Sequence, residues 1–428
     1  MARPVSWPQP GEWRRAIAIS SILIASAMIQ GICDVLATSG VGERGVVYMW
    51  AVDAGIALLG IGALARGVDS VDRRRLGISL LAGFAACYAF VWTQTLHSGN
   101  APFWWGVLGV VDTLQSNLVV LLAWALARDL FTEVEAIRLF GLLGGVAYIG
   151  TLAGTGLAGF AAHRTVLGIA ATDALLPLCT VLALITALVV AWLIPVHHQV
   201  HAPETEEDAP MTLRSLLDGE TLHYLWRQPT LRWLSALQVG NAASWTMMSL
   251  AVLFSLRSAG SGSADLQQAY SNVRIMGPFA HALVQAAISG WLLRRLGYGR
   301  LFLLTPLVLL FNLLVLGIAP GMAAAWLASL LIQFAFGAEG AAAHALLVRT
   351  PGHMRGRVGT FVMGTLPQSG YLFGCGLLFG ARWLTDTLAW HEDAAMRFAI
   401  VVGVLAALAN VVAGARLRRA FAEAPEVA

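Results

Sequence analysis

Lysine is absent from this 428-residue sequence, and charged residues of every kind are few. Charged residues make up 12% of the chain, against 58% hydrophobic residues, and the mean hydropathy is +0.71. A soluble globular domain carries roughly 25% charged residues, which keep its surface in water. The shortage of charge therefore excludes an ordinary soluble protein and indicates a chain that lies mostly in a membrane.

Cysteine is also scarce, and the motifs of common enzymes are missing. The four cysteines lie inside apolar runs, which is typical of small buried side chains and implies no disulfide framework. The sequence has neither a Walker-type phosphate loop nor an HExxH zinc motif. His197, His198 and His201 have no further ligands in their segment, so they predict no metal site. We therefore expect no enzyme activity, no cofactor and no nucleic-acid partner.

Apolar runs long enough to cross a lipid bilayer recur along the whole chain. We predict twelve spans, near 16–38, 46–65, 76–96, 103–127, 139–162, 170–195, 231–256, 267–292, 301–319, 322–348, 357–380 and 397–415. The fifth span carries glycines at four-residue spacing, Gly141 with Gly145 and Gly150 with Gly154. Such a stripe predicts that a neighbouring helix approaches closely, since small residues let two backbones meet within lipid.

The longest polar segment, residues 196–229, falls between the sixth and seventh spans. It begins with an acidic patch and continues into a stretch whose leucines have helix-like spacing, which predicts a helix lying on the membrane surface. The patch consists of Glu204, Glu206, Glu207 and Asp208. We predict three parts: a six-helix bundle at 1–195, a cytoplasmic linker at 196–229 and a second six-helix bundle at 230–428.

The two halves look like copies in parallel orientation. RRLG occurs at Arg74–Gly77 and again, 220 residues later, at Arg294–Gly297. Arg138 precedes the fifth span and Arg357 the eleventh, 219 residues apart. Two matches at nearly one offset favour a duplicated six-helix unit whose copies are related by an axis along the membrane normal.

Orientation follows from the arginines. Most of the 27 basic residues fall in the two termini, the central linker and alternate loops, which by the positive-inside rule lie in the cytoplasm. An even number of spans also places both ends on one side. The protein is therefore predicted to be an integral inner (cytoplasmic) membrane protein with both termini in the cytoplasm.

This arrangement resembles the major facilitator superfamily. Gly290, Arg294, Arg295, Gly297 and Arg300 are similar to the loop motif of that superfamily, with Arg294 in place of its acid. Within it, EAIRLFGLLGGVAYIGTLAG at 135–154 and RGRVGTFVMGTLPQSGYLFG at 355–374 resemble segments of the ATP/ADP translocase-like nucleotide transporters and their bacterial relatives. The resemblance implies an all-α membrane protein with twelve transmembrane helices in two pseudo-symmetric six-helix bundles. It also implies nucleotide exchange as one function.

Polar side chains within the spans indicate where a solute would pass, because burying one in a membrane is costly. Ser26 and the first-span candidates fall on a single helix face, as do the two candidates of the fourth span. Spans one, four, seven and ten would line the cavity if the superfamily resemblance holds. The candidate substrate-binding or coupling residues are Gln30, Asp34, Asp112, Gln115, Gln238, Asn241, Arg274, Gln333 and Glu339.

Arg274 is the most distinctive of these candidates, because it is a cation within an apolar span. It precedes Gly277 and Pro278, a pair that predicts a break in the eighth span beside the cation. One interpretation is that Arg274 docks a single carboxylate or phosphate of the solute. The other is that it forms a structural salt bridge to Glu339 or Asp53. His281 is expected to be a hydrogen-bonded packing residue.

We therefore predict a secondary active transporter that moves a small polar solute by alternating access. Proton coupling through Asp34 or Asp112 is a hypothesis, since loss of water disfavours a charged carboxylate. One intramembrane arginine among four acids cannot balance a nucleotide, so free ATP is expected to be a poor substrate. The alternatives are an ATP/ADP-type exchanger and a transporter-like receptor or assembly protein. The expected partners are the solute, protons and the lipid bilayer, and the oligomeric state stays open.

Overall fold

The computed structural model describes residues 10–67, 72–97, 101–131, 133–166, 169–194, 219–256, 263–284, 288–347, 358, 361–387 and 392–423. Almost all of these residues are helical. The exceptions include a short antiparallel pair of strands, β1 (Thr165–Val166) and β2 (Ile169–Ala170), in which Thr165 lies opposite Ala170. The acidic patch, the His197–His201 run and Arg357 lie outside the described residues.

The first half contains the six predicted spans in five helices. Helix α1 (Pro10–Gly67) holds the first two spans as separate limbs, because Gly42 interrupts it with φ 71° and ψ 175°. A positive φ is readily reached only by glycine. The remaining spans are α2 (Arg73–His97), α3 (Ala101–Leu130), α4 (Glu133–Ala161) and α5 (Leu175–Leu193), which follows the turn η1 (Ala171–Ala174).

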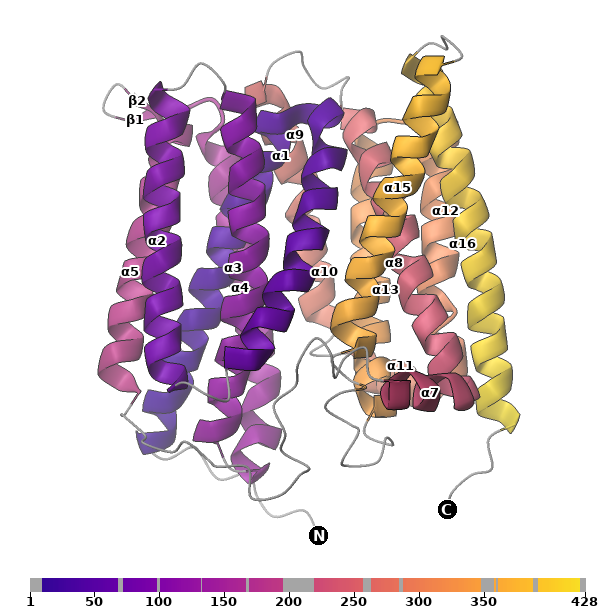
Figure 1. Cartoon of the computed structure of the whole chain (residues 1–428), viewed down its shortest axis with the longest axis horizontal. Helices are drawn as coiled ribbons and strands as arrows, with labels where there is room; N and C mark the ends of the chain where they lie inside the picture. Colours follow the sequence, from indigo (N-terminus) through magenta and orange to yellow (C-terminus); the bar gives the residue numbers. More distant parts are fainter. Residues whose placement is uncertain are drawn as a thin grey trace.

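The second half begins with the predicted surface helix, α7 (Gly219–Arg227), which lies across the end of the bundle in Figure 1. The seventh span is α8 (Pro229–Leu256), the ninth and tenth are α12 (Leu304–Ile318) and α13 (Met322–Leu347), and the twelfth is α16 (Glu392–Glu423). The eleventh starts as a π-helical turn, η5 (Phe361–Thr365), and continues as α15 (Leu366–Thr387). Pro367 is the second residue of α15, directly after the π-helical turn, and Gly370 lies inside regular helix.

The eighth span differs most from its prediction as one continuous helix. It is divided into α9 (Ser263–Arg274), α10 (Met276–Leu283) and the first part of α11 (Ser289–Leu301). Ile275 alone separates α9 from α10, and its helical φ of −65° and ψ of −30° show that the predicted opening beside Gly277 and Pro278 is slight. Two sharper changes come later: Gly297 interrupts α11 with φ 68°, and the chain bends by 64° between the end of α11 at Leu301 and the start of α12 at Leu304.

The helices cross a common slab, with connections at its two ends (Figure 1). Helix α1 begins and α16 ends at the end where α7 lies, here called the α7 end; the opposite end carries β1 and β2. Of the described helices, seven are individually long and apolar enough to cross a membrane, and the bent α11–α12 pair makes an eighth. The remaining crossings are short limbs or broken helices, such as Gly45–Ile61 and Gly145–Ala161. The chain is thus an all-α membrane protein whose helices fit a twelve-span fold.

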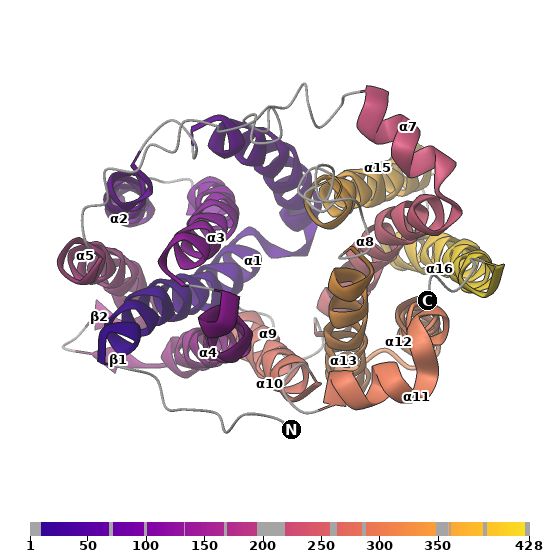
Figure 2. The same ribbon diagram turned by 90° about the horizontal axis from the view of Figure 1, so that it is seen from below.

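Seen along the helices, α1 to α5 gather on one side and α8, α12, α13, α15 and α16 on the other (Figure 2). Helices α9 and α10 lie beside α4, and α15 packs against the second limb of α1, where Tyr48 and Phe379 approach with ring centroids 4.7 Å apart. These contacts join the first six spans to the last six.

Glycines produce equivalent close contacts in both halves. A Cβ on Gly150 or Gly154 of α4 would collide with the backbone of α1 at Ile24 and Met28. Gly370 and Gly374 of α15, each 220 residues further on, face α8 in the same way. This confirms the predicted close approach for the second glycine pair and supports the duplication. At Gly145 a Cβ would meet nothing within 4 Å, so that position needs no glycine for packing.

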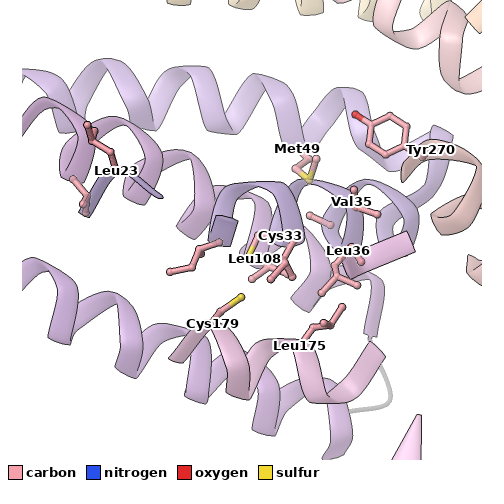
Figure 3. Close-up of a cluster of buried hydrophobic side chains, with 14 of the residues drawn as sticks. Leu23, Cys33, Val35, Leu36, Met49, Leu108, Leu175, Cys179 and Tyr270 are labelled. Atoms are coloured by element: carbon pink, nitrogen blue, oxygen red, sulfur yellow. The ribbon is translucent and has the colours of Figure 1, made fainter. Parts of the chain in front are cut away.

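The interior of the first half is a tightly packed hydrophobic cluster in which α1 is central. Cys33 of α1 and Cys179 of α5 lie together within it, near Leu36, Leu108 and Leu175 (Figure 3). Cys375 is also buried, whereas Cys87 is exposed, contrary to its predicted burial. Tyr270, which comes from α9, lies at the edge of the cluster in Figure 3. The second half therefore contributes a side chain to the core of the first.

Candidate functional site

An ion pair joins the two halves through the membrane interior. Arg274, the last residue of α9, donates from Nη2 and Nε to Oδ2 of Asp34 on α1, at 2.7 and 3.0 Å. The predicted partners of Arg274, Glu339 and Asp53, are wrong. Helix α9 packs against the first limb of α1, and this packing brings Asp34, rather than either of the other two acids, within hydrogen-bond distance of the guanidinium.

Both members of this pair remain partly accessible. The exposed fractions of the Arg274 and Asp34 side chains are 32% and 25%. The ring of Tyr270 lies beside the guanidinium, with its centroid 5.7 Å from Cζ. The pair carries no net charge, which lowers the cost of keeping both groups within a membrane. Arg274 is therefore not a free cation in this conformation.

Further contacts follow the antiparallel packing of α4 against α9 and α10, here called the α4–α9 seam. Gln267 donates to the carbonyl oxygen of Ala158 at 2.7 Å, and the hydroxyl of Ser271 donates to the carbonyl oxygen of Thr155. Gly159 faces Ser271 so closely that a Cβ there would collide with it.

The seam continues in both directions from these hydrogen bonds. Toward the β1–β2 end, His163 Nε2 lies 3.5 Å from Asp265 Oδ1, and both side chains are exposed. Toward the middle of the bundle, the rings of Tyr148 and His281 stack with centroids 4.5 Å apart. The seam thus holds the halves together from the β1–β2 end to about mid-depth.

The polar cluster of the first half lies between α1 and α3. Gln115 donates to Ser26 at 2.8 Å, and both residues are buried. Asp112, one turn earlier on α3, is 6% exposed, and its Oδ1 has no hydrogen-bond partner among the described residues. Gln30 is exposed on α1. The polar face predicted for span one therefore contacts two different helices, because Ser26 contacts α3 whereas Asp34 contacts α9.

A second polar cluster lies inside the other half. Glu339 of α13 is 4% exposed and accepts hydrogen bonds from Gln238 at 2.9 Å and from Asn241 at 3.0 and 3.1 Å. Asn410 of α16 donates to Oδ1 of Asn241 at 2.5 Å, which turns the amide nitrogen of Asn241 toward the carboxylate. Asn410 is not among the candidate residues predicted from the sequence. A lone amide in the apolar run ALANVVAG was the signal for it.

Gln333 belongs to a third contact, at mid-depth. Its Oε1 lies 3.0 Å from Nδ1 of His281, the histidine that stacks on Tyr148. His281 is thus hydrogen-bonded, as expected, but it also lies where the halves meet. Gly277 leaves room for Gln333, since a Cβ there would come within 2.8 Å of its Cγ. The three residues Gln333, His281 and Tyr148 are all half-buried.

The nine candidate residues therefore fall into separate groups around the junction of the halves. Asp34 and Arg274 pair across it; Gln238, Asn241 and Glu339 form one cluster; Gln115 bonds Ser26; and Gln333 bonds His281. Among the described residues, neither Gln30 nor Asp112 forms a hydrogen bond or ion pair with another candidate. Among these residues, no group of three or more His, Cys, Asp or Glu side chains could hold a metal ion.

A helical bundle of this kind, with ionised and amide side chains inside its spans, is typical of membrane transporters. The sequence model of the Major Facilitator Superfamily matches residues 16–375, so the chain belongs to that superfamily. No curated protein sequence matches the chain.

Solved structures share the fold at low sequence identity. A variant of the nucleoside transporter NupG has a TM-score of 0.67 at 12% identity, covering 94% of this chain and 99% of its own. A bacterial homologue of the human lysosomal transporter Spinster, in an inward-facing and unoccupied conformation, has a TM-score of 0.63 at 13% identity, covering 97% and 99%. The E. coli fucose:proton symporter FucP has a TM-score of 0.56 at 14% identity, covering 94% and 98%. At these identities the likeness concerns the fold alone.

Proposed function

We propose that this protein is a secondary active transporter that moves a small, neutral, polar solute by alternating access, coupled to protons through Asp34. The carrying observation is the half-buried Asp34–Arg274 ion pair, which joins the two halves inside the membrane. A contact of this kind has to break when the halves separate at that depth. Its strength therefore biases the equilibrium between the two access states.

Protonation is the step that would weaken the pair. A proton on Asp34 removes its negative charge, so that the Coulomb attraction to Arg274 disappears and only a hydrogen bond remains. The α4–α9 seam can then open from the β1–β2 end. When Asp34 loses its proton to the other side, the pair re-forms and the seam closes. This cycle couples proton movement to the alternation of access.

The solute class follows from the side chains near the junction. Gln238 and Gln333 are half-buried and Gln30 is exposed, and each amide offers both donors and an acceptor to solute hydroxyl groups. Tyr148 and His281 add ring faces at mid-depth. A nucleoside or sugar-like solute fits these groups, and structures with this fold include a nucleoside transporter and a fucose:proton symporter.

Nucleotide exchange, which the ATP/ADP translocase-like resemblance implies, fits less well. A triphosphate needs several cations at once. Arg274 is the one arginine that the sequence places deep within a span, and Asp34 neutralises it. We therefore propose that free ATP is a poor substrate.

We also propose that both termini and the linker are cytoplasmic, and that the two bundles comprise residues 1–195 and 230–428.

Purified protein in liposomes, with an imposed pH gradient, tests the proposal against uridine, fucose, alanine and ATP. We expect gradient-driven accumulation of uridine or fucose. Asp34→Asn should abolish accumulation but retain solute exchange, because asparagine mimics the protonated acid. Asp173→Asn, an acid in the turn η1, is the matched control and should keep both activities.

Three results would overturn the proposal. Robust ATP/ADP exchange would favour the nucleotide exchanger. Absence of any flux, with uridine or fucose still bound, would favour a receptor. Undiminished accumulation in Asp34→Asn would reject this residue as the coupling site while leaving transport itself in place.

A further inference from the structure

A pocket of about 420 Å³ opens at the α7 end, between the start of α12 and the last turns of α16. It is lined by Leu303, Ala415, Arg418, Arg419 and Ala422. We propose that this pocket binds the headgroup of an anionic phospholipid, with the two guanidinium groups on the lipid phosphate. Neither the transport path nor the polar clusters at the junction include any of these residues.

The pocket is held by packed neighbours rather than by a loose tail. Gly299 of α11 lies against the backbone and stem of Arg418, and a Cβ there would come within 3.1 Å of the Arg418 Cα. Phe421, three residues after Arg418, stacks near Tyr298 and Phe302, with ring centroids 5.8 and 6.1 Å away. These contacts fix the direction in which α16 presents its arginines.

The faces of α16 are clearly divided at this point. Leu417 is fully buried and Ala420 is 9% exposed, whereas Arg418 and Arg419 are both exposed. The helix is therefore anchored by its apolar side and leaves two adjacent cations at the pocket. Arginine suits this position because its planar fork binds phosphate oxygens bidentately.

Aromatic residues place the pocket at headgroup depth. Near the same end, Arg232 lies over Trp226 and Trp233 at 5.7 and 5.5 Å, and Arg295 of α11 lies over Trp291 at 5.4 Å. Trp226 and Trp291 are both exposed. Tryptophan is enriched at the membrane–water interface, and paired arginines reach from there toward the lipid phosphates.

Charge and lining together select a lipid rather than a soluble anion. None of the five lining residues is acidic, and Glu423, although adjacent in sequence, does not line the pocket. Two guanidinium groups can donate hydrogen bonds to the two non-bridging oxygens of one phosphodiester. Leu303 with the two alanines offers apolar contact to the glycerol and upper acyl carbons. Basic pockets between transmembrane helices at a membrane surface bind anionic headgroups on the same physical grounds.

Native mass spectrometry of the full-length protein, released from vesicles of equal phosphatidylglycerol and phosphatidylcholine, tests this site. We expect wild type to retain phosphatidylglycerol in preference to phosphatidylcholine. The double variant Arg418→Gln/Arg419→Gln should reduce that preference by roughly tenfold. Arg397→Gln, which removes a cation from the opposite end of the same helix, is the matched control and should leave the preference unchanged.

A second variant keeps the test independent of any folding defect in the first. Ala422→Glu adds a negative charge to an exposed pocket position and should also lose phosphatidylglycerol, with thermal unfolding unchanged in phosphatidylcholine. Equal retention by all variants would overturn the proposal, as would equal loss in Arg397→Gln. Displacement of the lipid by inorganic phosphate alone would identify a free-anion site instead and would equally reject the lipid assignment.

Discussion

At the scale of single residues, the polar side chains of the spans could be found from sequence, but their partners could not. Arg274 stood out because a charge in an apolar run requires compensation, yet four acids were available to it. Asp34 became the partner through the packing of α9 on α1, which is a property of the assembled helices. The Gln238–Asn241–Glu339 cluster was more predictable, because spans seven and ten each offered few polar groups.

A double-mutant cycle measures how strongly the ion pair is coupled. Arg274→Gln leaves the Asp34 charge without its partner, so we expect destabilisation of roughly 1–2 kcal/mol, less than for a fully buried pair because both side chains are partly exposed. Adding Asp34→Asn should recover part of this loss. Thermal unfolding of the wild type, the two single variants and the double variant in one detergent gives the coupling free energy between the two side chains. Strictly additive effects would show that the two side chains do not interact energetically.

At the scale of helices, the existence of a membrane span was easier to predict than whether that span forms one continuous helix. Hydropathy located the long spans because a bilayer demands about twenty apolar residues. It could not show that the eighth span is divided into α9, α10 and α11, since the break after α9 is a single apolar residue, Ile275, which does not interrupt the hydropathy pattern. Glycine spacing marked the contact of α4 with α1, yet of the three glycines whose surroundings the structure describes, Gly150 and Gly154 approach α1 closely and Gly145 does not.

Glycine substitutions in α4 test that distinction within one helix. Gly154→Leu forces a side chain into the backbone of α1, so we expect a loss of about 1–3 kcal/mol or failure to fold. Gly145→Leu is the matched control, because nothing lies within 4 Å of its Cβ position. The measurement is the yield of monodisperse protein and its unfolding temperature. Similar damage from both substitutions would mean that helix propensity or insertion, not close packing, accounts for the glycines.

At the scale of the whole molecule, both ends of the described chain and α7 lie at one end of the bundle (Figure 1). The arginine distribution predicts that this is the cytoplasmic end. Cysteines introduced at exposed positions of opposite ends can check the orientation, in a Cys87→Ser background. His223→Cys on α7 should resist an impermeant thiol reagent added to intact cells, whereas Arg164→Cys near β1 should react. The reverse pattern would invert the topology.

The proposed alternating access makes a stronger demand on the whole molecule, because it requires the α4–α9 seam to open once in every transport cycle. Gly159 and Ser271 face each other across it, with only 2.7 Å between the Cβ position of Gly159 and that of Ser271. A disulfide needs about 3.8 Å between its two Cβ atoms, so a small outward shift would accommodate the pair Gly159→Cys/Ser271→Cys. We expect an oxidant to cross-link the two cysteines and stop solute uptake in liposomes, and a reductant to restore it. Each single cysteine variant should be insensitive to the oxidant. Full uptake by the cross-linked protein would show that the seam stays closed throughout transport, and that the halves separate along some other surface.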